Sequence, residues 1–397
     1  MRIYLILSAI CMASLVNGQV GIGTNTPLAR LHVVDSSVLF SAPNDVPATP
    51  TAPPVNGAGR RMMWYADKAA FRAGYVGSFG STYWDMANVG KYSFAAGYNT
   101  RASGENSFAM GNGNTASGNS SVVLGMNATA SGERSFAMNG IATGTGATAL
   151  GSNSQAGGEE SVALGASSIA LGLYSTVIGP SIAVGDFATA IGLQNRAGGR
   201  YSLAMGKNAR TIHQGACVIG DASAQFTSDS VYSTASNQMT MRFVNGFRFF
   251  TSMNLSGGVE VYAGGGSWSS LSDKRKKENF KELNKEEVLT KVAALPVTTW
   301  NYKSQPADQR HIGPMAQDFY AAFQLDGVGN DTTINTVDID GVNMVAIQAL
   351  EKRTTLLQQE NEQLKKQLEM MNQRFEALEK MISNQGNPKN KKAPVTK

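Results

Sequence analysis

Residues 107–111 read SFAMG and residues 121–125 read SVVLG, and this recurring five-residue phrase decides the fold. Related phrases stand at 93–97 (SFAAG), 161–165 (SVALG) and 202–206 (SLAMG). The closing positions 97, 111, 125 and 139 fall every 14 residues, and the spacing recurs at 151, 165 and 179 and again at 192, 206 and 220. A fixed short period of this kind predicts one structural unit that is repeated and stacked.

Each repeat also holds a second, weaker phrase, such as TASG at 115–118 and 129–132. Two short strands and two glycine turns therefore fill each repeat. Because side chains alternate along a strand, Phe108 and Met110 share one face, while Ser107, Ala109 and Gly111 share the other. We expect stacking to bury the bulky face as a ladder. The pattern predicts a mainly β protein built on a parallel β-solenoid.

Cys217 lies in one of these phrases, ACVIG at 216–220, at the position where other copies carry Phe108 or Val122. We therefore expect a buried ladder residue rather than a reactive thiol. Cys11 falls within a predicted signal peptide, so the exported chain would hold one cysteine and no intramolecular disulfide. Stability must then come from packing or oligomerisation.

The repeat region, residues 91–220, resembles the head of trimeric autotransporter adhesins of the YadA type. The resemblance implies left-handed β-rolls that associate as a homotrimer. It does not specify a ligand, because the same roll also serves as a stalk. Two interpretations stay open: an adhesive head with a host-surface or glycan ligand, and a stalk that projects another part from a surface.

Four segments precede the repeats. Residues 1–18, with a basic start and a short apolar run, are typical of a secretory signal peptide and predict a secreted or cell-surface protein. Residues 19–42 predict a short β segment, and the proline-rich residues 43–60 predict an extended linker. Residues 61–90 are rich in aromatic side chains, and we expect them to cap the open end of the solenoid, with sugar binding as the alternative.

The segment after the last repeat, residues 221–271, is expected to form a β neck. Within it, residues 238–250 predict a β-hairpin around Asn245 and Gly246, because Asn-Gly favours the tight turns that join hairpin strands.

A basic stretch then begins with Ser272, Asp273, Arg275 and Lys277. Taken alone it reads as a helix N-cap followed by a solvated face. Its spacing resembles the signature that opens the intramolecular chaperone of phage endosialidase tail spikes, a family of self-cleaving serine peptidases. In that signature Ser-Asp is followed by Arg two residues on and by Lys two residues further, and Asn279 fits the usual continuation.

Three later passages agree with this resemblance over residues 272–350. They are an aromatic strand at 297–302, a turn into a helix at 311–318 that contains His311, Gly313 and Gln317, and a final helix at 342–350. The resemblance therefore implies a small α+β chaperone domain.

The resemblance also implies a reaction. The chain would be cut between Leu271 and Ser272, with Ser272 and Lys277 as the catalytic residues. A serine hydroxyl needs a nearby base to act as a nucleophile at neutral pH. Lys277 can accept its proton only in the neutral form, which the neighbouring positive charges or partial burial would favour. The chain's status as an enzyme is open, because its only substrate would be itself.

Apolar positions continue from the final helix as heptads over residues 345–383. One seam position runs from Ile347 to Ile382 and contains Asn361, and the other runs from Leu350 to Leu378. This spacing predicts a coiled coil whose one strongly polar seam residue, Asn361, fixes the register. Residues 384–397 are rich in Asn and Lys and predict a disordered tail.

Charge and histidine content argue against other classes of function. From Ser272 onward 19 Lys and Arg residues face 17 Asp and Glu residues, and residues 19–271 hold 14 against 12, so nucleic acid is not an expected partner. The histidines, His32, His213 and His311, have no metal-ligand spacing, and no phosphate-binding loop is present, so we expect no metal and no cofactor. No segment of the mature chain is expected to span a membrane. An uncut adhesin, or a phage-tail-fibre-like protein with a permanent coiled-coil foot, remains the alternative to self-cleavage.

Overall fold

A computed structural model describes residues 18–325 and 331–385 of the chain. The predicted signal peptide and the predicted disordered tail lie almost wholly outside these residues. The chain divides into two compact units, Met1–Gly246 and Phe247–Lys397, and each is described by itself.

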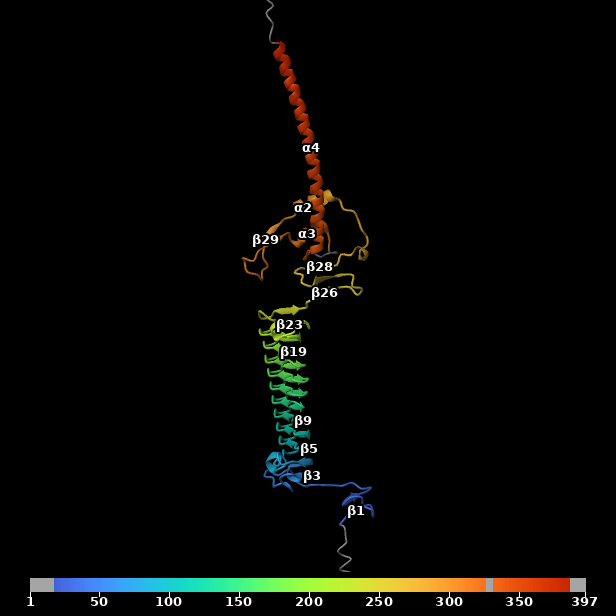
Figure 1. The fold of residues 1–397 in the computed structure, drawn as a ribbon, viewed down its shortest axis with the longest axis vertical. Coiled ribbons are helices and arrows are strands. Elements are labelled where there is room, and N and C mark those ends of the chain that lie inside the picture. The colour runs from blue at the N-terminus through green and yellow to red at the C-terminus, as the bar shows by residue number, and fades with distance from the viewer. Residues whose placement is uncertain (1–17, 326–330, 386–397) are drawn as a thin grey trace, which may run out of the picture. The chain divides into compact units, whose positions relative to one another are not determined.

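The first unit is dominated by a stack of two-stranded coils (Figure 1). One strand of each coil joins a 13-stranded sheet and the other joins a 10-stranded sheet, with parallel pairing between successive coils, as in Phe108↔Val122 and Thr115↔Thr129. The predicted parallel β-solenoid is thereby confirmed. The coils contribute ten strands to the larger sheet, which are β5 (Phe94–Tyr98), β7 (Phe108–Asn112), β9 (Val122–Met126), β11 (Phe136–Met138), β13 (Thr148–Leu150), β15 (Val162–Leu164), β17 (Thr176–Ile178), β19 (Thr189–Leu193), β21 (Leu203–Lys207) and β23 (Cys217–Gly220). Those of the smaller sheet are β6 (Arg101–Ala102), β8 (Thr115–Ala116), β10 (Thr129–Ala130), β12 (Ile141–Ala142), β14 (Gln155–Ala156), β16 (Ile169–Ala170), β18 (Ile182–Ala183), β20 (Arg196–Ala197), β22 (Ala209–Thr211) and β24 (Val231–Tyr232).

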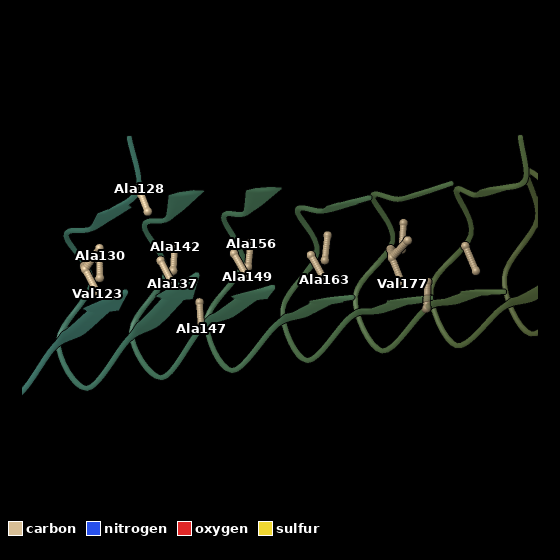
Figure 2. Packing of buried hydrophobic residues seen from close by; sticks show 14 of the residues in the cluster. Val123, Ala128, Ala130, Ala137, Ala142, Ala147, Ala149, Ala156, Ala163 and Val177 are labelled. Carbon is tan, nitrogen blue, oxygen red and sulfur yellow. The ribbon is translucent and has the colours of Figure 1, made fainter. Parts of the chain in front are cut away.

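The interior of the solenoid is made of small side chains. Val123, Ala137, Ala149 and their counterparts in the other coils are fully buried between the two sheets (Figure 2). The expectation that the bulky face is buried between stacked coils is therefore wrong for the single chain, in which Met110 is 50% exposed. A coil of about 14 residues leaves little space between its two strands, and the side chains buried in the repeats are mostly Ala, Ser and Val with a few Asn and Thr, so Phe and Met side chains point outward.

Cys217 follows the same rule. It lies in β23, in register with Leu203 and Met239, and is partly exposed rather than buried. Its predicted membership of the bulky ladder is correct, but the burial predicted for it is not found in the single chain.

Glycine closes the long strand of most coils because successive backbones approach closely there. At Gly111, φ is +121°, and a Cβ would lie 2.0 Å from the carbonyl oxygen of Gly125. Any other residue at this position would collide with the next coil.

A hairpin forms the N-terminal end of the larger sheet. Strands β3 (Gly59–Tyr65) and β4 (Ala70–Val76) pair antiparallel around the 3-10 turn η1 (Ala66–Lys68), and β4 pairs in parallel with β5. Arg72 of β4 occupies the core column that alanine fills elsewhere, and Trp84, just before the turn η2 (Met86–Asn88), is also fully buried. The first strands, β1 (Val20–Ile22) and β2 (Leu31–Val33), form a separate parallel pair.

The other end of the larger sheet is β25 (Met239–Arg242), which pairs in parallel with β23. The predicted hairpin around Asn245 and Gly246 is wrong, because β26 (Gly246–Phe250) belongs to a different sheet with β27 (Gly258–Tyr262) and β28 (Ser269–Ser270). Residues 239–242 instead pair with β23, whose backbone would otherwise form the open edge of the last coil.

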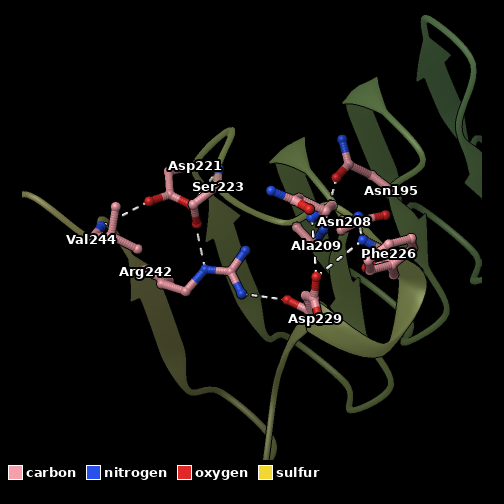
Figure 3. Close-up of polar contacts among 10 residues, drawn as sticks. Asn195, Asn208, Ala209, Asp221, Ser223, Phe226, Asp229, Arg242 and Val244 are labelled. Carbon is pink, nitrogen blue, oxygen red and sulfur yellow. Dashed lines mark hydrogen bonds and ion pairs between the residues drawn. The ribbon is translucent and has the colours of Figure 1, made fainter.

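Polar side chains fasten this end of the solenoid (Figure 3). The carboxylate of Asp221 accepts hydrogen bonds from Arg242 Nε at 3.3 Å and from the Val244 amide at 2.8 Å. Arg242 also donates to the carbonyl oxygen of Asp229, the last residue of the turn η3 (Thr227–Asp229). The segment after β23 is thus tied to the segment after β25.

The second unit has a small helical core. Helix α2 (Lys285–Ala294) contributes Val288 and Leu289, α3 (Ala316–Phe323) contributes Phe319, and α4 (Thr336–Gln385) contributes Val342 and Ala346. A two-stranded antiparallel sheet, β29 (Thr298–Trp300) and β30 (His311–Gly313), lies between α2 and α3 in the sequence. Beyond this core α4 continues as one helix whose seam residues Leu357, Leu364 and Leu378 are more than half exposed in the single chain.

Candidate functional site

The predicted cleavage bond lies where a sheet ends. Strand β28 pairs antiparallel with β27, and the amide of Leu271 extends this pairing by donating to the carbonyl oxygen of Gly258 at 3.1 Å. Leu271 is partly buried, whereas Ser272 is exposed. The Leu271–Ser272 bond therefore joins an ordered strand to an accessible turn.

That turn is the 3-10 turn η4 (Lys274–Lys276), and Asp273 caps it. A side-chain oxygen of Asp273 accepts from the amide of Arg275 at 2.9 Å, and its carbonyl oxygen accepts from the amide of Lys276 at 3.0 Å. The amide of Lys277 then closes the turn on the carbonyl oxygen of Lys274 at 3.2 Å. The sequence taken alone predicts a helix capped by the serine, whereas the structure has a 3-10 turn whose cap is the next residue, Asp273.

The turn brings Lys277 back to Ser272. The ammonium nitrogen Nζ of Lys277 donates to the hydroxyl oxygen of Ser272 at 2.7 Å, although the two residues are five positions apart. This distance is within hydrogen-bond reach, as required of a nucleophile and its base. Both side chains are exposed in the single chain.

Asp273 and Arg275 form an ion pair beside this contact. The guanidinium contacts the carboxylate through NH2 at 2.8 Å and through Nε at 3.1 and 3.2 Å to its two oxygens. The side-chain hydrogen bond from Arg275, followed by that from the Arg275 amide, lowers the pKa of Asp273, and the same side-chain bond raises the pKa of Arg275. Both groups are therefore ionised at neutral pH.

The remaining residues singled out from the sequence lie elsewhere in the second unit. His311 begins β30, where its ring packs at 4.8 Å on Trp300 and its Nε2 lies 2.9 Å from Oε1 of Gln305. Gly313 ends the same strand, and Gln317, in the first turn of α3, lines an open cavity of about 620 Å³ together with Trp300.

No hydrogen bond or ion pair recorded within residues 18–325 and 331–385 joins Ser272 or Lys277 to His311, Gly313 or Gln317. Asn279 has a φ of +60°, a left-handed conformation that Asn tolerates better than most residues, and so it shapes the chain after the turn. These residues support the fold of the chain in the positions observed.

Two contacts of the site were not predicted from the sequence. Nζ of Lys276 donates to the carbonyl oxygen of Leu255 at 3.0 Å, and Gly258 receives the amide of Leu271. Both acceptors are backbone oxygens, so no side-chain pattern in the sequence signals them.

Comparison with family models gives two matches. Residues 272–327 match the peptidase-family model described as chaperone of endosialidase. The match begins at Ser272. The YadA head domain repeat matches residues 89–114, 116–138, 142–168, 156–181 and 183–209, which confirms the resemblance of the repeat region to YadA-type heads. No curated protein matches the chain.

The two matches together support a trimeric adhesin-like or tail-fibre-like protein with an intramolecular chaperone. The chaperone match also points to a family of self-cleaving peptidases. Within the part of the chain that the structure describes, no three His, Cys, Asp or Glu side chains are grouped to hold a metal ion, and no helix is both long and apolar enough to cross a bilayer.

Proposed function

We propose that this chain is an exported homotrimeric surface fibre whose C-terminal chaperone assembles the trimer and then releases itself by cutting the bond between Leu271 and Ser272. The 2.7 Å contact between Lys277 Nζ and Ser272 Oγ carries the cleavage part of the proposal. The finished fibre would consist of residues from the end of the signal peptide to Leu271.

Two apolar surfaces of the single chain support the trimer. The outward side chains of the 13-stranded sheet form a stripe that includes Phe108, Leu124 and Ile178, and the α4 seam exposes Leu357 and Leu364. Seam residues kept at heptad spacing favour association of helices. Association of three copies would remove both surfaces from water.

The chemistry follows from the contact. Neutral Lys277 accepts the proton of the Ser272 hydroxyl as Oγ attacks the carbonyl carbon of Leu271. The C–N bond breaks, the proton passes from Lys277 to the departing amine of Ser272, and an ester joins Leu271 to Ser272 Oγ. Water then hydrolyses this ester, which leaves a carboxylate on Leu271 and restores the Ser272 hydroxyl.

The position of the cut suits maturation. Strand β28 and the Leu271 amide are paired with β27 upstream of the scissile bond, whereas the turn η4 lies downstream. Cleavage therefore removes no backbone pairing from the sheet that remains on the fibre.

The test is the mass of the C-terminal fragment from the full-length chain. We expect wild type to yield a fragment that begins at Ser272, and Ser272→Ala and Lys277→Ala to yield none. Lys281→Ala, at an exposed neighbouring lysine, is the matched control and should be cut like wild type. Hydroxylamine should speed wild-type cleavage, because it attacks esters and not amides. A trimeric wild-type chain that stays whole would refute the proposal.

An uncut fibre with a permanent coiled-coil foot is the second candidate. The exposure of Ser272 and Lys277 favours it, because the single chain provides neither burial nor exclusion of water at the bond. The same mass measurement decides between the two candidates. Both candidates are compatible with an adhesive head that binds a host-surface or glycan ligand and with a stalk that projects another part from a surface.

A further inference from the structure

We propose that Asp273 and Arg275 are positioning residues for the self-cleavage reaction: their ion pair holds the turn that brings Lys277 to Ser272 and cancels the negative charge that would keep Lys277 protonated. This inference rests on the proposed function. It assigns a role to two residues that do not themselves touch the scissile bond.

Asp273 and Arg275 hold the turn through both backbone and side-chain contacts. Asp273 both caps η4 through the Arg275 amide and receives the Arg275 guanidinium on both carboxylate oxygens. One residue is thus held at its backbone and at its side chain by the other. The turn that they close ends at Lys277, whose extended backbone sends Nζ to the Ser272 hydroxyl.

The Asp273–Arg275 ion pair also balances charge within the turn. A carboxylate near an amine favours the protonated amine, and a base must be neutral to accept a proton. Asp273 lies within the turn that Lys277 closes, but its charge is offset by a guanidinium that stays ionised at every pH at which the fold persists. Asp273 thus caps the turn η4, while its ion pair with Arg275 leaves the two side chains with no net charge.

The other charged groups around the turn are Lys274, Lys276 and Glu278 on the same segment. The loop packed against it offers the Leu255 carbonyl to Lys276, and β27 carries Glu260, which pairs with Arg248 at 3.5 Å. Within the described residues, the ion pair recorded for the Asp273 carboxylate is the one with the Arg275 guanidinium.

The test is the rate of fragment release from the full-length chain, measured against pH for assembled trimers. Arg275→Ala leaves the Asp273 charge uncompensated, so the acid limb of the profile should move to higher pH by about 0.5–1 unit. Arg275→Gln keeps a donor for the carboxylate but no charge, and should show the same shift even if Arg275→Ala fails to assemble. Adding Asp273→Asn to Arg275→Gln should return the limb to its wild-type position.

Arg275→Lys separates charge from geometry. It keeps the charge but not the two-pronged contact, so it should slow cleavage at every pH without moving the acid limb. An unshifted acid limb in Arg275→Gln, or a shift that Asp273→Asn does not reverse, would overturn the charge role while leaving self-cleavage standing. A trimeric wild-type chain that is never cut would instead overturn the proposed function and this inference with it.

Discussion

Arg72 shows how a single residue ends a repetitive core. Its fully buried guanidinium donates to the carbonyl oxygens of Phe71, Ser93 and Ala102 and to the Ser93 hydroxyl, at 2.8 to 3.0 Å. Burial lowers its pKa to about 10, so it remains charged at neutral pH. The carbonyl oxygens of Ser93 and Ala102 also accept from the amides of Phe71 and Gly90, so the guanidinium adds a second hydrogen bond to each of them at this end of the core.

Arg72→Ala should therefore destabilise the solenoid by about 2–4 kcal/mol, because it removes four buried hydrogen bonds and leaves a cavity where the side chain packed. Chemical denaturation of the full-length chain, followed by the loss of β structure, measures the change. Arg60→Ala, at an exposed arginine of the adjacent strand, is the control and should change the free energy of unfolding little. Equal effects of the two substitutions would contradict the capping role.

The same scale shows what alternation along a strand can and cannot predict. The sequence places Phe108 and Ala109 on opposite faces, but alternation alone does not say which face is inside. The width of the coil decides which face points inward. That width follows from the 14-residue length of the repeat and from the number of those residues that lie in turns. Hydrophobicity alone predicts that Phe108 lies inside the coil, but the limited space there is filled by Ala109 instead.

At the scale of an element, the ionisation of Asp221 makes the stability of the C-terminal end of the solenoid depend on pH. Burial opposes its ionisation, but hydrogen bonds from the Ser223 hydroxyl, the amides of Val244 and Ser223, and Arg242 outweigh burial and hold its pKa at about 2 (Figure 3). An unfolded aspartate has a pKa of about 3.9. Because the folded value is the lower one, this stabilisation is complete above about pH 4 and is lost as the pH falls towards 2.

The melting temperature of the solenoid should consequently fall between about pH 4 and pH 2, with a loss of about 2 kcal/mol from this group. Asp221→Asn should have a lower melting temperature near neutral pH and a flatter dependence on acid. Glu105→Gln, at an exposed carboxyl, should keep the wild-type dependence. An unchanged acid profile in Asp221→Asn would show that Asp221 does not tie down this end.

The coiled-coil helix gives a prediction of another kind. Asn361 is the polar member of an otherwise largely apolar seam, and in the single chain its side chain donates to the Leu357 carbonyl oxygen at 3.0 Å. Asn361→Leu should raise the melting temperature of the assembly but permit more than one oligomeric state, since a buried polar seam residue trades stability for register. Gln359→Leu, outside the seam, should leave the oligomeric state unchanged. Light scattering of the full-length Ser272→Ala chain distinguishes these outcomes.

Elements with a strong period were predictable, and junctions were not. The heptads and the 14-residue phrase each repeat many times, so local errors average out. The hairpin around Asn245 failed because its first strand, β25, found a better partner in the open edge of the solenoid than in β26. The contact between Ser272 and Lys277 depends on a single 3-10 turn, which only the resemblance to a known signature could anticipate.

For the whole molecule, the central difficulty is bringing three chains into register. Each coil of the solenoid pairs with its neighbours within one chain, so a chain can form its coils alone. The contacts between chains are different, because they must form in one register out of the many that a repetitive surface allows. A coiled coil at one end raises the effective concentration of the three chains and fixes their starting alignment.

Cleavage should then leave a trimer that stays folded but can no longer be reassembled once it has been unfolded. We expect trimers of Ser272→Ala, which keep the chaperone, to recover after denaturation in guanidinium and dilution. The wild-type product that ends at Leu271 should unfold slowly and then fail to reassemble, because the element that aligned its chains is gone. Recovery is measured as the fraction of trimer by light scattering, with uncut Lys277→Ala as a second chaperone-bearing control. If the cut product reassembles as well as Ser272→Ala, register is encoded in the solenoid itself, and the C-terminal unit has no chaperone role in this chain.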